Sequence, residues 1–190
     1  MGMMKQAFGH FAFLAWRGVS LLRTAPPGAL RSLELSDGVR RDAQVEWPEW
    51  ENDYIPHGGL EGKTVLDVGA GEGETCAFFF SHGVQRVIAI EADKEKVNRL
   101  YRNALRQGWD ITIIGAPFRL ADLSRGHDFA KVDIEGAESA LLQMQSMPSP
   151  FVMEVHSKEL KGAFQERFPQ LRWRKRNWFR DLWIAKADRG

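Results

Sequence analysis

Acidic side chains gather in the segment KVDIEGAES, which runs from Lys131 to Ser139. It brings Asp133, Glu135 and Glu138 close together directly after HDFAKVDI, a segment whose pattern predicts a short strand. Carboxylates crowded at a strand end repel one another. We therefore expect these carboxylates to have a functional role at this strand end.

A second strand end supplies a histidine. In the segment VMEVH, Glu154 lies within a predicted strand and His156 at its end. Because the ends of adjacent parallel strands meet at one edge of a sheet, Asp133, Glu135 and His156 are predicted to come together. Imidazole titrates near neutral pH, so His156 is the natural base for a hydroxyl proton, and Asp133 or Glu135 could orient it. These three are the candidate catalytic residues.

Two other interpretations of these carboxylates stay open. Asp133, Glu135 and His156 are also of the types that bind Mg²⁺ or a similar ion, although we predict no metal site. Glu135 and Glu138 could instead cap the helix predicted near Ala137, where the helix dipole favours negative charge. For Glu138 the cap is the preferred interpretation.

A glycine loop follows another predicted strand in TVLDVGAGEGET, which contains Gly69, Gly71 and Gly73. In an open α/β sheet, ligands bind beyond the carboxyl ends of the strands, where glycine lets the backbone approach them closely. A dinucleotide fingerprint requires G-x-G-x-x-G, but here the third glycine comes one position early and Glu74 stands in its place. Nucleotide-like ligands are therefore expected, with a departure from the dinucleotide pattern.

Charge narrows the ligand further. Glu72 and Glu74 would flank the loop with negative charge and repel a pyrophosphate. S-adenosylmethionine has no phosphate and carries sulfonium and ammonium groups, so it is the predicted cofactor. Glu91 ends the next strand in VIAIEAD, where a carboxylate can accept both ribose hydroxyls. Asp67 could hold the loop amides or the ligand ammonium, or serve only as a structural acid.

The elements that must position these residues alternate along the chain. Strands are predicted at Thr64–Val68, Arg86–Ile90, Ile111–Ile114, Phe129–Asp133, Phe151–Val155, Leu171–Arg176 and Leu182–Ala187. Helices are predicted near Thr75–His82, Lys94–Gln107, Ala137–Gln145 and Lys158–Arg167. Apolar strands separated by amphipathic helices indicate a mostly parallel α/β sheet that is covered on both faces.

Three regions are expected. Residues 1–24 form an N-terminal helical extension whose apolar run, Phe8–Trp16, is too short to cross a bilayer. This helix is expected to pack on the domain, or to serve self-association or peripheral membrane contact. Residues 25–60 are predicted as a hairpin, turning at Ser36-Asp37-Gly38, and an aromatic connector. Residues 61–190 form the α/β domain.

Composition bounds the class of protein. The 190 residues are 44% hydrophobic and 27% charged, which is ordinary for a globular domain, and a net charge of +1 gives no overall attraction to nucleic acid. The single cysteine, Cys76, excludes an internal disulfide and a multi-cysteine zinc site. These features predict a cytoplasmic protein with no transmembrane segment.

The motifs resemble a known family. VLDVGAGEGET and IAIEAD resemble motifs I and II of the class I S-adenosylmethionine-dependent methyltransferases, and KVDIEGAE with VMEVH resembles the FkbM family within them. The resemblance covers roughly positions 50–186 and implies a Rossmann-like, seven-stranded, doubly wound sheet. It also implies S-adenosylmethionine as donor and O-methylation of a small molecule or glycan hydroxyl. The link between Ile114 and Phe129 is shorter than in longer relatives.

The C-terminal segment LRWRKRNWFRDLW interleaves basic and aromatic residues. Such a pattern can bind nucleic acid, which keeps an RNA methyltransferase as the alternative, but a hairpin of the last two strands is the favoured interpretation. Trp47, Trp50 and Tyr54 either line an acceptor pocket or belong to the core. A dinucleotide oxidoreductase and a non-catalytic binding protein are the remaining alternatives.

Overall fold

One seven-stranded sheet organises the part of the chain that the structure describes. This computed structural model describes residues 28–135, 137–148, 150–177 and 182–187. The predicted helix of residues 1–24 lies outside the described residues, and so do positions 178–181 of the basic C-terminal segment.

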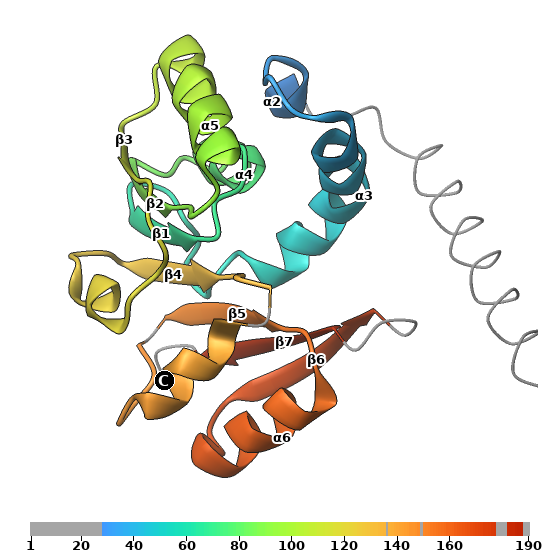
Figure 1. Cartoon of the computed structure of the whole chain (residues 1–190), viewed down its shortest axis with the longest axis vertical. Helices are drawn as coiled ribbons and strands as arrows, with labels where there is room; N and C mark the ends of the chain where they lie inside the picture. The colour runs from blue at the N-terminus through green and yellow to red at the C-terminus, as the bar shows by residue number, and fades with distance from the viewer. Residues whose placement is uncertain (1–27, 136, 149, 178–181, 188–190) are drawn as a thin grey trace, which may run out of the picture.

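The strand order places a crevice at the centre of the sheet. The strands are β1 (Thr64–Val68), β2 (Arg86–Ile90), β3 (Ile111–Ile114), β4 (Phe129–Val132), β5 (Phe151–Val155), β6 (Arg172–Asn177) and β7 (Leu182–Ala187). Their spatial order is β3-β2-β1-β4-β5-β7-β6, with β1 to β5 parallel and the β6–β7 hairpin antiparallel (Figure 1). The chain reverses direction across the sheet between β1 and β4, and ligands of open α/β sheets bind at such a switch point.

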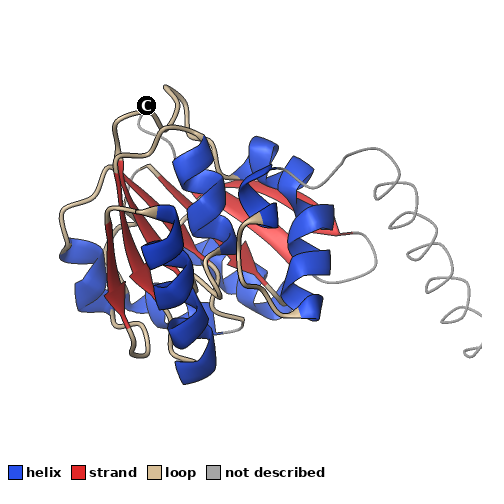
Figure 2. Ribbon diagram, turned by 90° about the horizontal axis from the view of Figure 1, so that it is seen from above, coloured by secondary structure: helices blue, strands red, loops and turns tan. Residues whose placement is uncertain are grey.

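Helices cover both faces of the sheet (Figure 2). They are α2 (Gly28–Arg31), α3 (Asp37–Asp53), α4 (Glu74–Ser81), α5 (Lys94–Gln107) and α6 (Lys158–Arg167), with 3₁₀ segments η1 (Leu120–Ser124) and η2 (Ala137–Gln143). Alternate strand residues feed two cores. Val65 of β1 packs with α2, α3 and α4, whereas its neighbour Leu66 packs with η2 and α6. The predicted Rossmann-like fold class is confirmed.

Most predicted elements are observed where the pattern placed them. Five strands and the helices α5 and α6 have the predicted bounds. β4 ends at Val132, so Asp133 lies just beyond it, and β6 is shifted by one residue. The helix predicted at Ala137–Gln145 is a shorter 3₁₀ segment.

The predicted hairpin within residues 25–60 is wrong. Ser36, expected in its turn, is the N-cap residue of the helix α3, and Asp37 lies in the first helical turn, where its charge suits the helix dipole. Ala43, Trp47 and Trp50 are buried along one face of α3, at the spacing of a helix. The long apolar side chains therefore favour a helix that packs on the sheet over an exposed two-stranded ribbon.

Candidate active site

The glycine loop between β1 and α4 is pressed against the end of β4. Gly69, Gly71 and Gly73 have φ angles of 76°, 58° and 101°, in the left-handed region that favours glycine. A Cβ atom on Gly69 would lie 1.7 Å from the backbone oxygen of Asp133. The three predicted glycines thus make a loop whose backbone has no room for side chains.

Glu91 fastens this loop to the end of β2. One carboxylate oxygen accepts a hydrogen bond from the Gly71 amide at 2.9 Å, and the other accepts one from the Asp93 amide at 2.8 Å. Glu91 is nearly buried and lines the cavity beside the loop. Each carboxylate oxygen can accept more than one hydrogen bond, so Glu91 retains acceptor capacity for a ligand.

Asp67 lies behind the loop, in a buried ion pair. Its carboxylate accepts a hydrogen bond from the Thr75 hydroxyl at 2.6 Å and lies 3.2 Å from the Lys131 ammonium. Lys131 also donates to the Gly69 carbonyl at 2.9 Å. Burial opposes the charge on Lys131, but Asp67 and Asp133 outweigh it and raise the pKa of Lys131 above its ordinary value. Asp67 therefore holds the loop indirectly, through Lys131.

The two glutamates of the loop have different surroundings. Glu72 is 2% exposed and is bonded to Arg99 at 3.0 Å and to the Ser36 amide at 2.6 Å, so it ties α5 and the start of α3 to the loop. Glu74 instead lines the cavities beside the loop. Burial raises the pKa of Glu74 to about 7. Of the two, only Glu74 brings its charge to a cavity wall.

Two cavities meet at the strand ends. The loop cavity has a volume of about 320 Å³. It is lined by Val68, Gly69, Gly71, Glu74, Ile90, Glu91, Ala92, Lys96, Ala116, Phe118, Asp133, Ile134 and Glu135. The α3 cavity, of about 370 Å³, lies under α3. It is lined by Val39, Asp42, Ala43, Glu46, Trp50, Tyr54, Gly69, Glu74, Thr75, Lys96, Lys131, Asp133, Glu135, Glu154, His156 and Leu182. The wall that both cavities share includes Asp133 and Glu135.

Asp133, His156 and Glu138 form a chain of charges that runs from this shared wall into the protein interior. Glu138 is fully buried, and its carboxylate lies 3.2 Å from His156 Nδ1. On the other side of the ring, Asp133 Oδ1 lies 3.6 Å from His156 Nε2. The structure thus brings the predicted pair Asp133 and His156 together and adds Glu138, which sequence analysis assigned to a helix cap.

The pKa values of this pair are displaced together. Burial raises the pKa of Asp133 to about 7, with repulsion from Glu154 adding to it. Burial opposes the charge on His156, but the carboxylates of Glu138 and Asp133 outweigh it and raise the pKa of His156 to about 9. The two groups lie 3.6 Å apart and titrate as a coupled pair, in which Asp133 keeps a proton and His156 keeps its charge to a higher pH than usual.

The arrangement favours a proton network over a metal site. Atoms of Asp133, Glu138 and His156 lie within 4.8 Å of one another, which is close enough for one ion. However, the two carboxylates approach opposite nitrogens of the ring. An ion bound to one nitrogen would have to draw the carboxylate away from the other.

Glu135, the third predicted catalytic residue, stands apart from this pair. It is exposed, has a φ of 50° and lines both cavities. Residues other than glycine seldom adopt a positive φ, and such conformations cluster at functional sites. Its position suits contact with a ligand at the junction of the cavities.

A buried charge network supports the floor of the α3 cavity. Glu154 accepts hydrogen bonds from the Tyr54 hydroxyl and from the Arg176 guanidinium. Tyr54 and Trp50 line the cavity, yet they are 1% and 3% exposed, and Trp47 packs in the core beside them. The aromatic residues of this region are therefore mainly core.

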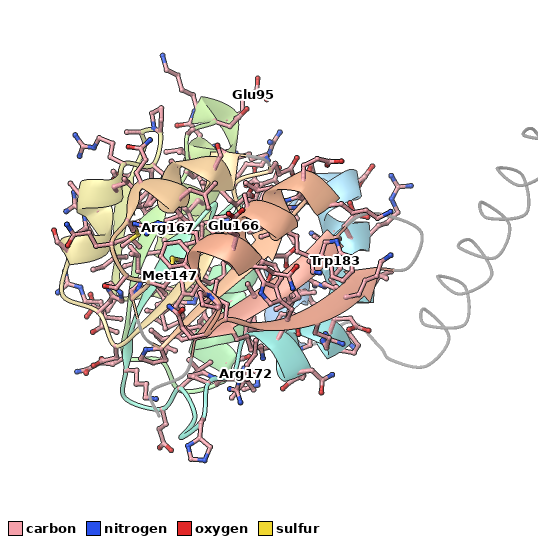
Figure 3. All side chains as sticks on the ribbon, turned by 90° about the horizontal axis from the view of Figure 1, so that it is seen from below. Glu95, Met147, Glu166, Arg167, Arg172 and Trp183 are labelled. Atoms are coloured by element: carbon pink, nitrogen blue, oxygen red, sulfur yellow. The ribbon has the colours of Figure 1, made fainter. Side chains whose placement is uncertain are left out.

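Two arginines of the basic C-terminal segment, Arg174 and Arg176, pair with carboxylates of α3. Arg174 contacts Asp53 at 2.6 Å and Glu49 at 3.1 Å, and Arg176 lies 3.4 Å from Glu46. On the other side of the hairpin, Lys161 of α6 lies 4.1 Å over the Trp183 ring. Figure 3 shows Trp183 beside the ribbon of α6. The predicted hairpin of β6 and β7 is thus observed, with its charges and aromatic rings engaged on opposite faces.

Comparison with known proteins identifies the fold. No family model and no curated protein matches the chain. A methyltransferase from Pyrococcus furiosus superposes with a TM-score of 0.58 at 13% identity, over 83% of this chain and 89% of that chain. The ribosomal protein L11 methylase of Lactobacillus delbrueckii subsp. bulgaricus has a TM-score of 0.56 at 17% identity, over 82% of this chain and 81% of that chain.

An RNA-modifying enzyme is also similar. A 16S rRNA methyltransferase of T. thermophilus, crystallised with S-adenosylmethionine and guanosine, has a TM-score of 0.57 at 16% identity. The similarity covers 82% of this chain and 44% of that chain. These neighbours show that the chain shares the Rossmann-like fold of these three methyltransferases. Among the described residues, none of the helices combines the length and apolarity that a bilayer crossing requires.

Proposed function

We propose that the chain is an S-adenosylmethionine-dependent methyltransferase that methylates a hydroxyl of a small molecule or glycan. One observation carries the proposal: the loop cavity and the α3 cavity meet at Asp133 and Glu135. This arrangement suits a donor on one side and an acceptor on the other. We also propose that the chain is related to the FkbM family, whose motifs it resembles, and that it is cytoplasmic.

The loop cavity has the features that the donor requires. Gly69 and Gly71 line this cavity and allow close approach of the backbone, and Glu91 would accept hydrogen bonds from the ribose hydroxyls. Gly73, the third predicted glycine, does not line the cavity and instead leaves room for Leu100 of α5. Glu74 has a pKa of about 7 because burial opposes its charge, and a cationic ligand beside it would relieve this cost. Asp67 contributes through Lys131, which holds the Gly69 carbonyl.

The acceptor side would supply mainly a base, because methyl transfer depends chiefly on aligning the acceptor hydroxyl with the methyl group of the donor. When bound, S-adenosylmethionine supplies an electrophilic methyl group on a sulfonium, which becomes a neutral thioether after transfer. Asp133 in its ionised form takes the hydroxyl proton as the new carbon–oxygen bond forms. His156, charged at neutral pH, stabilises Asp133 and the developing negative charge on oxygen. Glu138 is a positioning residue that fixes the imidazole through Nδ1.

The sequence pattern predicts His156 as the base, whereas the pKa values of the pair favour Asp133 for that role. A histidine with a pKa of about 9 is protonated at pH 7 and cannot accept a second proton. Asp133 has a pKa of about 7, close to the optimum for a base near neutral pH. We therefore expect methyl transfer to increase as the pH rises through about 7.

An RNA acceptor is the second candidate. It is supported by the T. thermophilus rRNA methyltransferase among the structural neighbours and by the basic composition of the C-terminal segment. The pairing of Arg174 and Arg176 with α3 carboxylates reduces the positive charge that this segment offers to phosphate. We therefore rank it below a hydroxyl on a small molecule or glycan.

The first experiment tests the donor and the transfer separately. Calorimetry should show that S-adenosylmethionine and S-adenosylhomocysteine bind and that NADH does not, and methyl-labelled donor should label a component of fractionated cell extract. Asp133→Asn should keep donor binding and lose transfer by about 100-fold or more, since it removes the base. The matched control Asp110→Asn changes a carboxylate that is largely exposed and should retain activity.

Contrary results are distinct. Binding of NADH without S-adenosylmethionine would overturn the proposal in favour of an oxidoreductase. Because Asp133 and Glu138 approach opposite ring nitrogens, transfer should persist in EDTA. Loss of activity in EDTA with recovery on adding Mg²⁺ would replace the proton network with a metal site.

A further inference from the structure

We propose that the acceptor carries a cationic group close to the hydroxyl that is methylated, as amino alcohols and amino sugars do, and that phosphate-bearing acceptors are disfavoured. The inference rests on the proposed methyl transfer and concerns the α3 cavity. It is drawn from the distribution of charge over the cavity wall and from an oxygen atom in that wall that has no hydrogen-bond donor.

Carboxylates outnumber cations in the wall of the α3 cavity. The acidic lining residues are Asp42, Glu46, Glu74, Asp133, Glu135 and Glu154. The basic ones are Lys96, Lys131 and His156. Charged residues behind the wall also affect this excess of carboxylates, because they can neutralise charges of the lining residues.

Two of the three cations are already neutralised from behind the wall. Lys131 is 1% exposed and pairs with Asp67, which does not line the cavity. His156 pairs with the buried Glu138, which does not line it either. Both cations also lie near Asp133, at 3.9 Å from Lys131 and 3.6 Å from His156, but each is matched in number by one carboxylate behind the wall. Of the basic lining residues, Lys96 is therefore the one whose charge is left to balance the carboxylates of the wall.

Some of the carboxylates are neutralised in the same way. Glu154 is bonded to the buried Arg176, and Glu46 lies 3.4 Å from the same guanidinium. Asp42 also has an interaction partner, so neither Asp42 nor Glu46 counts as an unbalanced negative charge of the wall. Glu74, Asp133 and Glu135 remain against Lys96.

The remaining charge exceeds what the donor can match. Glu74, Asp133 and Glu135 line both cavities, as Lys96 does, so they surround the junction where the methyl group would pass. S-adenosylmethionine carries one net positive charge, from its sulfonium, ammonium and carboxylate groups. With Lys96 it balances two of the three carboxylates, so the junction stays negative above about pH 7, where Glu74 and Asp133 are mainly ionised.

Asp133 has an unsatisfied oxygen at this point. Its Oδ1 atom is buried, and among the described residues no donor makes a hydrogen bond to it, since His156 Nε2 lies 3.6 Å away. A buried acceptor without a donor costs free energy. Burial raises the pKa values of both Asp133 and Glu74 to about 7, and a cation bound beside them would lower both. Oδ1 itself is shielded from solvent, but the Asp133 side chain as a whole is 28% exposed. An ammonium group, which donates three hydrogen bonds, would add donors and positive charge at the exposed part of this carboxylate.

A phosphate group would meet the opposite situation. The guanidinium of Arg176 is 4% exposed and is engaged by Glu154, and Arg174 is engaged by Asp53. Neither is placed to neutralise a phosphate in the α3 cavity. A phosphorylated acceptor would bring negative charge to a wall that is already negative.

The test uses three matched probes that differ in charge: glucosamine, glucose and glucose 6-phosphate. Binding to the full chain saturated with S-adenosylhomocysteine is followed by NMR chemical-shift changes at pH 7.5. We expect glucosamine to bind at least about tenfold more tightly than glucose, and glucose 6-phosphate to bind most weakly. Glu135→Gln should reduce the glucosamine preference, whereas the control Glu166→Gln, an exposed change on α6 labelled in Figure 3, should preserve it.

The outcomes separate this inference from the proposed function. Equal binding of glucosamine and glucose, tighter binding of glucose 6-phosphate, or no binding of any probe would overturn the cationic acceptor. The proposed methyl transfer would stand in each case if S-adenosylmethionine still binds the chain and labels a component of the extract. Failure of the donor to bind would remove both.

Discussion

The loop cavity and the α3 cavity share a wall, but different contacts build them. The loop cavity depends on backbone: Gly69, Gly71 and Gly73 adopt positive φ angles, and Glu91 holds the loop through the Gly71 amide. The α3 cavity depends on side chains that meet from distant parts of the chain. Tyr54 reaches Glu154 across 100 positions, and Arg176 reaches back to α3.

This difference determines how each half responds to substitution. A backbone site is specified by the absence of side chains, so one added methyl group can close it. A site made of paired side chains is specified by complementarity, so removing one partner should damage it and removing both should partly repair it. Three predictions test this contrast.

The largest effect is expected for Gly69→Ala, on the backbone side. The added methyl would lie 1.7 Å from the Asp133 carbonyl oxygen, and alanine would be strained at a φ of 76°. The loop or β4 must move, so we expect donor affinity to fall by about 100-fold or more and thermal stability to fall with it. Calorimetric titration with S-adenosylhomocysteine and thermal unfolding measure the two effects.

Gly126→Ala is the matched control. Nothing lies within 4 Å of its added methyl, and the residue has no positive φ. Its stability should change by less than about 0.5 kcal/mol. Equal losses in the two variants would mean that glycine replacement in general, rather than the close approach at Gly69, weakens the protein.

The same contrast explains what the sequence could predict. The glycine loop and Glu91 lie close together in the sequence. A positive φ requires glycine and an acceptor for the loop amide requires a side chain such as glutamate, so the residue types alone indicated these positions. The hairpin prediction was wrong because Ser36-Asp37-Gly38 suits a turn as well as a helix start, and the spacing of Trp47 and Trp50 was the signal for the helix. The turn signal and the helix spacing conflict in this segment, and burial of the tryptophans in the core decides for the helix.

Two site residues were missed for a related reason. Lys131 was part of a strand pattern, and its pairing with Asp67 follows from the register of β4 against β1. Glu138 has the position of a helix cap, and its contact with His156 depends on how η2 sits against β5. The motif KVDIEGAE contained both residues, but their roles depend on neighbours far away in the sequence.

The second effect in size is expected for Arg176→Met, on the side-chain side. The substitution leaves Glu154 buried without its cation, which costs about 3–5 kcal/mol. For a chain of this length that corresponds to a fall in Tm of roughly 6–20 °C. The double variant Arg176→Met/Glu154→Gln removes both charges, and the Tyr54 hydroxyl can still donate to the Gln carbonyl. It should recover most of the loss in a thermal scan.

Arg102→Met provides the comparison at the surface. Arg102 pairs with Glu34 at 2.7 Å, but both side chains are substantially exposed, so the variant should unfold at nearly the same temperature as the wild type. If the double variant at positions 154 and 176 were no more stable than Arg176→Met alone, the pairing would not be what holds this part of the fold.

The smallest effect is expected where the two halves meet, at Glu74. Its pKa is raised from 4.5 to about 7 because burial opposes the charge. In the unfolded chain Glu74 ionises near pH 4.5, whereas in the folded protein it holds its proton up to about pH 7. The folded state therefore binds more protons over this window, and the contribution of Glu74 to stability is lost as the pH rises through it.

Glu74→Gln removes this titration. The variant should be close to the wild type in stability at pH 5 and should become more stable above pH 7, by roughly 1 kcal/mol or 2–4 °C in Tm, since the cavities leave Glu74 partly solvated. The control Glu166→Gln, at an exposed position, should show no growth of this difference with pH. Saturating S-adenosylmethionine should shrink the gain, because a bound cation favours the Glu74 carboxylate. If the increase in stability did not depend on pH, it would come from the packing of residue 74 and not from the charge of Glu74.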